Sequence, residues 1–133
     1  MPSQGHSMPT ILIVDDDDAV RAILYDLLSV NYECDTARMA EEALQYLQVE
    51  SYDAILTDIS MPGLNGVELL KRVQENDLAT PVILISGKGA EEDPQALIDL
   101  GAFAYINKPF DLDEIEDVVE RALEQTQSSR PGI

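Results

Sequence analysis

The sequence predicts an α/β domain of three layers, in which a doubly wound, five-stranded parallel sheet lies between two layers of helices. Five short runs typical of strands alternate with five segments whose apolar residues recur at helical spacing. Strands that alternate with helices in this way form parallel sheets covered on both faces. At 133 residues the chain suits one domain that buries roughly two-thirds of the surface exposed on unfolding.

The first strand and helix have the clearest pattern. Residues 10–15 (TILIVD) are apolar up to their final acid, as in strands buried on both faces. Residues 16–18 are acids that can cap the next helix and interact favourably with its dipole. That helix is predicted by Val20, Ile23, Leu24, Leu27 and Leu28.

The next two units repeat this order. Residues 32–37 alternate apolar and polar side chains, and residues 53–58 (DAILTD) hold the apolar run Ala-Ile-Leu between Asp53 and a final Thr-Asp. Each predicted strand is followed by a segment with helical spacing. The helical positions are Ala40, Ala43, Leu44 and Leu47 after the second strand, and Val67, Leu70 and Val73 after the third.

The last two units complete the domain. Residues 81–86 (PVILIS) and 103–106 (FAYI) predict the fourth and fifth strands. A short helix near residues 95–100 can begin at Pro94 and end at Gly101, since proline suits the first turn and glycine the C-terminal end. The fifth helix begins near residues 111–114 and packs through Ile115, Val118, Val119 and Leu123.

The ends of the chain differ in composition from the middle. Residues 1–8 are polar and aperiodic, so we expect a disordered leader or an expression remnant there. Residues 9–126 are expected to form the domain. Residues 127–133 are expected to be a tail or a truncated linker, either of a stand-alone domain or of a longer regulator or hybrid kinase.

The charge balance excludes several classes of partner. Twenty-six acids against eight basic residues give a formal charge of −18, which repels nucleic acid and anionic membranes. We expect most of these acids to be ordinary solvated surface. The single cysteine, Cys34, excludes an internal disulfide, and no apolar run approaches the ~20 residues of a membrane span. Together with the lack of a secretory signal, this predicts a cytoplasmic protein with a reduced thiol.

Chemically useful side chains follow four of the predicted strands. Asp15 and Asp16 follow the first strand, Asp58 ends the third, Ser86 ends the fourth, and Lys108 lies just after the fifth. Ligands of such sheets bind beyond the carboxyl ends of the strands, so these side chains are expected to converge. Alone, Asp58 would be read as a turn residue, because aspartate bonds readily to nearby backbone.

Three carboxylates in one cleft repel one another unless a cation neutralises them or protons are taken up. Oxygen ligands without His or Cys favour a hard cation, and an open site with few protein ligands suits Mg²⁺. Beside them, Lys108 is either a structural counter-ion or a binder of phosphoryl oxygen. Ser86 either caps a turn or donates to a second phosphoryl oxygen.

Four motifs closely resemble the receiver domain of two-component response regulators: VDD at 14–16, TDISMPG at 57–63, ISG at 85–87 and KPF at 108–110. Each alone is weak, but together, in order and on strand ends, they are specific. The resemblance covers Thr10 to about Gln125. It implies a flavodoxin-like (βα)5 fold with strand order 2-1-3-4-5.

The resemblance implies a role for each matching residue. Asp58 would be the phosphoacceptor, taking a phosphoryl group from a phosphohistidine or a small acyl phosphate. Mg²⁺, or Mn²⁺ in its place, would be held directly by Asp16 and Asp58, through water by Asp15, and by the backbone carbonyl of Ser60. Lys108 would pair with the phosphoryl group.

Switching and lifetime roles also follow from the resemblance. Ser86 would move to bond the phosphoryl group, and Tyr105 matches the family's aromatic switch position, although an ordinary half-buried aromatic is the alternative. Ser60 and Lys88 occupy positions that flank the path of the hydrolytic water. We therefore expect both to modulate phosphoryl lifetime, whereas an exposed and inert Lys88 is the alternative.

The implied partners are a histidine kinase or a histidine phosphotransfer protein. Output would pass through the face of the fourth helix, fifth strand and fifth helix to an output domain or partner that the sequence does not identify. The domain would be a signalling phosphoacceptor that assists its own phosphorylation and dephosphorylation rather than an enzyme. It would bind neither nucleic acid nor membrane, and a phosphorylation-linked homodimer stays open.

Rival classes lack features that they require. An FMN carrier needs an uncharged loop after the first strand, where this chain has acids, and a P-loop needs more than Gly-Lys-Gly at residues 87–89. A metal-dependent phosphatase would need an acid at Ser60. In a histidine phosphotransfer protein, His6 would have to lie within the fold. The live alternative is a receiver-like module that binds partners without phosphorylation.

Overall fold

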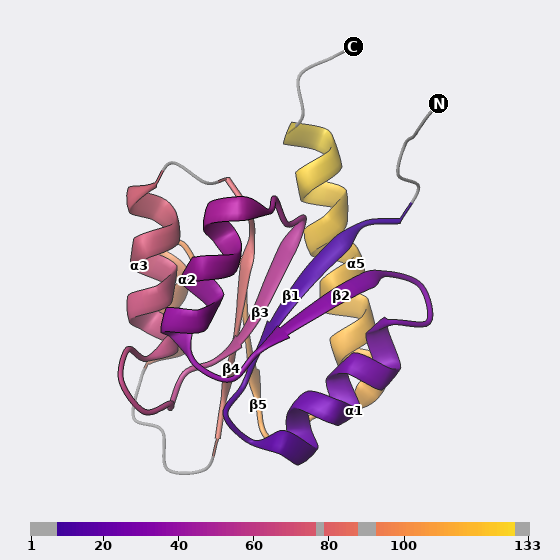
Figure 1. Ribbon diagram of the computed structural model, residues 1–133, viewed down its shortest axis with the longest axis horizontal. Helices are drawn as coiled ribbons and strands as arrows, with labels where there is room; N and C mark the ends of the chain where they lie inside the picture. The colour runs from indigo at the N-terminus through magenta and orange to yellow at the C-terminus, as the bar shows by residue number, and fades with distance from the viewer. Residues whose placement is uncertain (1–7, 77–78, 88–92, 130–133) are drawn as a thin grey trace.

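The computed structural model describes residues 8–76, 79–87 and 93–129 (Figure 1). Strands and helices alternate along the chain as the sequence predicts. The strands are β1 (Thr10–Val14), β2 (Glu33–Ala37), β3 (Ala54–Asp58), β4 (Val82–Ser86) and β5 (Ala104–Asn107). The helices are α1 (Asp18–Leu28), α2 (Ala40–Val49), α3 (Gly66–Glu75), α4 (Pro94–Asp99) and α5 (Leu112–Ser129).

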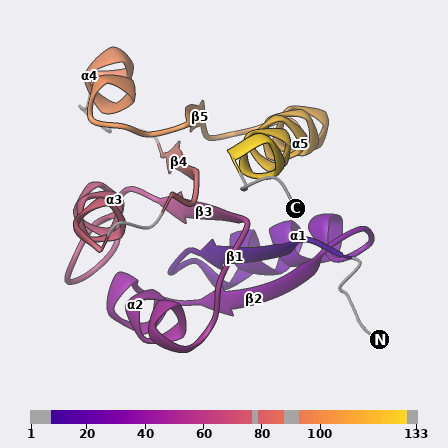
Figure 2. The same cartoon turned by 90° about the horizontal axis from the view of Figure 1, so that it is seen from above.

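The strands form one parallel sheet in the order β2-β1-β3-β4-β5. Helices α1 and α5 cover one face, and α2, α3 and α4 cover the other (Figure 2). The predicted fold class, its flavodoxin-like topology and its strand order are therefore confirmed. Helix α5 continues to Ser129, whereas the expected domain ended at residue 126. The three predicted domain ranges stay predictions.

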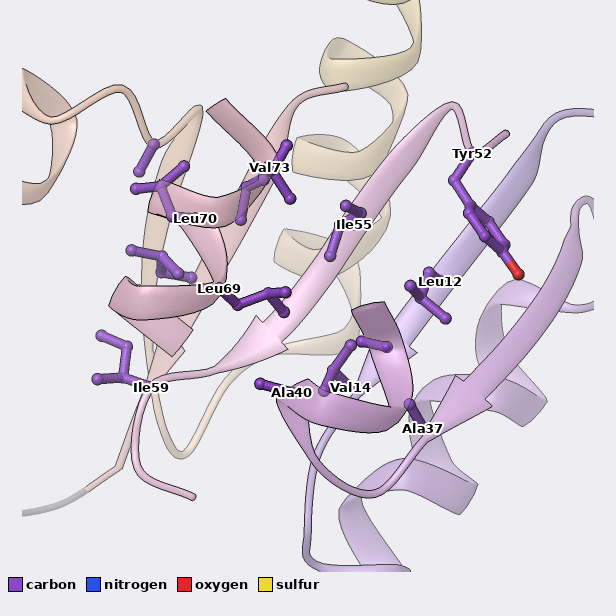
Figure 3. Close-up of a cluster of buried hydrophobic side chains, with 14 of the residues drawn as sticks. Leu12, Val14, Ala37, Ala40, Tyr52, Ile55, Ile59, Leu69, Leu70 and Val73 are labelled. Atoms are coloured by element: carbon purple, nitrogen blue, oxygen red, sulfur yellow. The ribbon is translucent and has the colours of Figure 1, made fainter. Parts of the chain in front are cut away.

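Alternation along the strands divides the core into two clusters. In β1, Leu12 and Val14 face the layer of α2, α3 and α4, while Ile11 and Ile13 face α1 and α5. Figure 3 shows the first cluster, where Leu69, Leu70 and Val73 of α3 lie against the sheet. Because both faces of the sheet are covered, β3 and β4 are buried along their whole length, which explains their apolar sequences.

Local capping explains where the helices begin. The Asp17 side chain accepts hydrogen bonds from the amides of Ala19 and Val20, as predicted for the acids of residues 16–18. Helix α4 begins at Pro94 as predicted, and Gly101, beyond its end, has a φ of +114° that suits glycine. No helix within the described ranges is both long and apolar enough to cross a membrane.

Candidate functional site

Four strands deliver the predicted site residues to one edge of the sheet. The strands are parallel, and their register pairs Asp58 with Ile85 and Ser86 with Asn107, so their carboxyl ends lie level. Asp15 follows β1 directly, Asp58 ends β3, Ser86 ends β4 and Lys108 follows β5. The convergence predicted from the order of strands and helices is therefore present in the structure.

The three acids form a compact group. One carboxylate oxygen from each of Asp15, Asp16 and Asp58 lies within 4.8 Å of the others. Asp15 is fully buried and Asp58 is 5% exposed, whereas Asp16 is exposed. Asp15 and Asp58 are therefore held inside the protein, whereas Asp16 is accessible to solvent.

Lys108 supplies the positive charge of the site. Its Nζ lies 3.2 Å from Oδ2 of Asp15 and 3.5 Å from Oδ2 of Asp58. The side chain is about one-fifth exposed, so it reaches the acids from the surface. The peptide bond between Lys108 and Pro109 is cis. The ammonium thus bridges the two buried carboxylates.

Burial sets the protonation behaviour of these groups. The pKa of Asp58 is raised to about 6, mainly by burial and secondly by the neighbouring Asp15 carboxylate, while Lys108 acts to lower it. Burial also raises the pKa of Asp15, although the Asp17 amide and Lys108 oppose it. For Lys108, burial would lower the pKa, but the two carboxylates outweigh it and the pKa is raised.

One carboxylate oxygen of the site differs from the others in its contacts. Asp58 Oδ1 is buried and receives no hydrogen bond from the described residues, while Oδ2 faces Lys108. A buried, unpaired carboxylate oxygen is costly unless a cation or donor occupies the space beside it. With two further carboxylates nearby and no His or Cys in the group, the donor set fits a hard, oxygen-preferring cation such as Mg²⁺.

The other predicted residues that the structure describes, Ser86, Ser60 and Tyr105, differ in burial. Ser86 is buried, and its hydroxyl donates to the carbonyl of Gly87 over 3.3 Å. Ser60 is exposed and lines an open hollow on the loop after β3. Tyr105 is half-buried and packs against the α2, α3 and α4 side of the core. Lys88 lies outside the described residues.

Two neighbours of the site were not singled out from the sequence. A side chain at Gly66 would place Cβ 2.3 Å from the backbone oxygen of Asp58, so only glycine fits this close approach. Arg21 donates from Nη1 to the backbone oxygen of Asp15 over 2.7 Å. Its spacing of three residues from Asp18 on a predicted helix was the available signal, since such pairs lie on one face.

Comparison with protein families agrees with this geometry. The model of the "Response regulator receiver domain" family matches residues 11–120. The chain belongs to this family. As a receiver domain it is a signalling domain of two-component systems, and its acidic group is compatible with Mg²⁺ binding.

Curated relatives of this receiver domain are longer response regulators. It is 39% identical over 124 residues to the regulatory protein AtoC of Escherichia coli, covering 92% of this chain and 27% of AtoC. It is 34% identical to the DNA-binding transcriptional regulator NtrC of Klebsiella pneumoniae, covering 89% of this chain and 25% of NtrC. The alkaline phosphatase synthesis regulator PhoP of Bacillus subtilis is 33% identical, with 92% and 51% covered. The chain thus spans a quarter to a half of these relatives.

Solved structures of receiver domains superpose on nearly the whole domain. The receiver domain of the Francisella response regulator 1452 is 30% identical, with a TM-score of 0.82 and coverage of 89% of this chain and 98% of that one. A putative response regulator from Chloroflexus aurantiacus is 35% identical, also with a TM-score of 0.82, and 89% and 99% are covered. The receiver fold is therefore shown by sequence and by shape.

Proposed function

We propose that this receiver domain accepts a phosphoryl group on Asp58 in a Mg²⁺-dependent reaction, with a phosphohistidine of a partner protein as donor. The observation that carries the proposal is the buried Asp58 carboxylate, with one oxygen unpaired among the described residues and the other 3.5 Å from the Lys108 ammonium. An ordinary turn aspartate needs neither burial nor a lysine beside it. The two further acids, within 4.8 Å, give the site its capacity for a cation.

The proposed reaction is an in-line displacement at phosphorus. An Asp58 oxygen forms the new oxygen–phosphorus bond while the phosphorus–nitrogen bond of the donor breaks, and the electron pair leaves with the imidazole nitrogen. Lys108 lies where it can neutralise charge on the transferred phosphoryl oxygens. To do so it must weaken its contact with Asp58, whose charge is consumed when the acyl phosphate forms.

The same residues are proposed to hold the metal. Asp16 and Asp58 would bind Mg²⁺ directly, Asp15 through water, and Ser60 through its backbone carbonyl, and Mn²⁺ could replace it. When bound, the cation supplies positive charge that offsets the repulsion between the acids and the phosphoryl group. Exposure of Asp16 and Ser60 leaves the site open on the side where a donor would approach.

Phosphorylation is proposed to switch the face formed by α4, β5 and α5. A phosphoryl group brings about two negative charges into the site, and this charge favours arrangements in which donors approach it. Ser86 is buried beside the site and bonds only weakly to the Gly87 carbonyl at 3.3 Å, so its hydroxyl is available as a donor. Movement of Tyr105 would carry the change to α4. The lifetime roles of Ser60 and Lys88 stay predictions.

A histidine kinase or a histidine phosphotransfer protein is the proposed donor, in the cytoplasm. NtrC is named as a DNA-binding transcriptional regulator. For this chain we propose a signalling role without direct nucleic-acid binding, since its formal charge is −18.

Intact-mass analysis after incubation with acetyl phosphate tests this proposal. We expect the mass to increase by one phosphoryl group when Mg²⁺ is present, and no increase when the metal is chelated. A matched control with Arg121→Met, which removes an exposed cation of α5 that pairs with Asp117, should behave like the wild type. If the protein binds Mg²⁺ and still gains no phosphoryl group, the domain is an interaction module and the proposal is wrong.

Mg²⁺ binding should weaken in acid because a proton competes with the metal for Asp58. The pKa of Asp58 is about 6 in the metal-free protein, so the carboxylate is largely ionised at neutral pH and becomes protonated below that value. Apparent affinity should fall by about tenfold per pH unit below about pH 6, as expected when binding releases one proton. Calorimetric titrations at several pH values measure this, and a constant affinity down to about pH 5 would contradict it.

A further inference from the structure

Arg21 joins helix α1 to the loop that carries two of the three acids. Its Nη1 donates to the backbone oxygen of Asp15 over 2.7 Å, and Nη2 pairs with the carboxylate of Asp18. The side chain is only 16% exposed, although its Asp18 partner is 81% exposed. The guanidinium is thus tucked against the protein, and its hydrogen bond to Asp15 is made to backbone rather than to a side chain.

We propose that Arg21 is a positioning residue of the metal site, which holds the peptide group between Asp15 and Asp16 so that the Asp16 carboxylate points toward Asp58. This inference rests on the proposed function, because it concerns the same Mg²⁺ site. Arg21 is not proposed as a ligand of the metal. It acts through the backbone of Asp15.

The contacts around the loop explain why this peptide group needs support. Asp15 is fixed on its other atoms, since its amide donates to Ala37 over 3.1 Å and its Oδ1 accepts from the Asp17 amide over 2.9 Å. The Asp15 carbonyl starts the peptide that leads to Asp16. Asp16 is exposed, and within the described part of the chain its side chain has no hydrogen bond. The Asp15 side chain holds the Asp17 amide on the far side of Asp16, and Arg21 holds the carbonyl of the peptide group on the near side.

The arginine fork suits this task better than a point charge. Its planar guanidinium presents several N–H donors in a fixed geometry, so it can bond a carbonyl and a carboxylate at once. Asp18 binds Nη2 of the guanidinium, and the first turn of α1 fixes the backbone of Arg21. A lysine at this position would keep the charge but would satisfy the two acceptors less well.

The direction of the change in Mg²⁺ affinity separates a positioning role of Arg21 from a simple effect of its charge. Removing a cation near three carboxylates makes the site more negative, which by itself would strengthen Mg²⁺ binding. Loss of positioning has the opposite effect, because ligand orientation is disturbed. Residues that orient metal ligands typically contribute about 10–100-fold to metal affinity.

Calorimetric titration of the full chain with Mg²⁺ tests the inference. We expect Arg21→Met to bind Mg²⁺ about tenfold more weakly than the wild type, with Arg21→Lys in between. Arg121→Met is the matched control, because Arg121 pairs with Asp117 at 3.3 Å and reaches no backbone oxygen of the site. It removes the same charge and should leave the affinity unchanged.

Two further measurements exclude a merely structural role. With acetyl phosphate, Arg21→Met should need more Mg²⁺ for half-maximal phosphorylation, yet approach the wild-type rate at saturating Mg²⁺. In the metal-free protein, hydrogen exchange at the amides of Asp16 and Asp17 should be faster in Arg21→Met than in Arg121→Met. Thermal melts establish that each variant is folded. If Arg21→Met does not fold, the comparison of Arg21→Lys with the wild type decides the test.

The outcomes distinguish this inference from the function on which it rests. If the wild type binds Mg²⁺ and both Arg21 variants bind it equally well or more tightly, the positioning role is wrong and the proposed function stands. If the wild type binds no Mg²⁺ at all, the metal-dependent function itself is overturned, and this inference falls with it.

Discussion

Replacing Asp58 by asparagine should stabilise the metal-free protein, by about 3 kcal/mol at neutral pH. The folded state raises the pKa of Asp58 from 3.8 to about 6, mainly through burial, so keeping this carboxylate ionised opposes folding. Asparagine has nearly the same shape and no charge, and it removes the repulsion from Asp15. Chemical denaturation of both proteins with metal chelated measures the difference.

The pH dependence of this difference has a definite sign. An acid whose pKa is raised on folding gives the folded protein stability that is fully present below the unfolded pKa and is lost as the pH rises through the folded one. The advantage of Asp58→Asn should therefore shrink as the pH falls from about 7 to about 4. An asparagine variant that is less stable than the wild type at neutral pH would contradict the assigned burial cost.

Lys108→Met should destabilise the metal-free protein, by about 2 kcal/mol at neutral pH, because two buried carboxylates lose the cation that bridges them. This loss should be smaller than for a fully buried ion pair, since the Lys108 side chain is about one-fifth exposed. The pKa values of Asp15 and Asp58 should rise further in this variant. Urea denaturation, and NMR titration of the carboxyl carbons, measure the two effects.

A double-mutant cycle makes the Lys108 prediction specific. In the Asp58→Asn background the loss caused by Lys108→Met should be smaller, because one of the two buried charges is already gone. Arg121→Met, which breaks the exposed pair with Asp117, should change stability little. Equal losses from Lys108→Met in both backgrounds would show that the ammonium does not act through Asp58.

The fold could be predicted from the sequence because the apolar runs of the strands and the helical spacing of apolar residues between them are both strong. The buried strands β1, β3 and β4 are continuous apolar runs, and every predicted strand lies within one residue of the observed one. Strand order was implied by the resemblance and not by periodicity, since alternation alone does not say which strands are neighbours.

The site could be predicted in outline because parallel strands bring their carboxyl ends to one edge. Asp15, Asp16, Asp58 and Lys108 were predicted to converge, and their contacts in the structure agree with that. What each residue does there stays a prediction. Position along the chain cannot show which oxygen of Asp58 is unpaired or how deeply each acid is buried, because these depend on side-chain packing.

Arg21 and Gly66 show what the pattern of residues could not reveal. The spacing of Arg21 from Asp18 predicts a pair on one face of α1, but the bond of Arg21 to the Asp15 carbonyl depends on the path of the loop. Gly66 begins α3, where glycine has no special merit as a helix former. Only the approach of its backbone to that of Asp58 explains it.

Identification of the modified residue shows directly which side chain accepts the phosphoryl group. Treating the phosphorylated protein with borohydride reduces an aspartyl phosphate to homoserine, which peptide mass spectrometry can locate. We predict homoserine at position 58, and no reduction product in the Asp58→Asn variant. Homoserine at another acid, or a phosphoryl group on Ser60 or Ser86 that resists the reduction, would contradict the assignment of Asp58 as the phosphoacceptor.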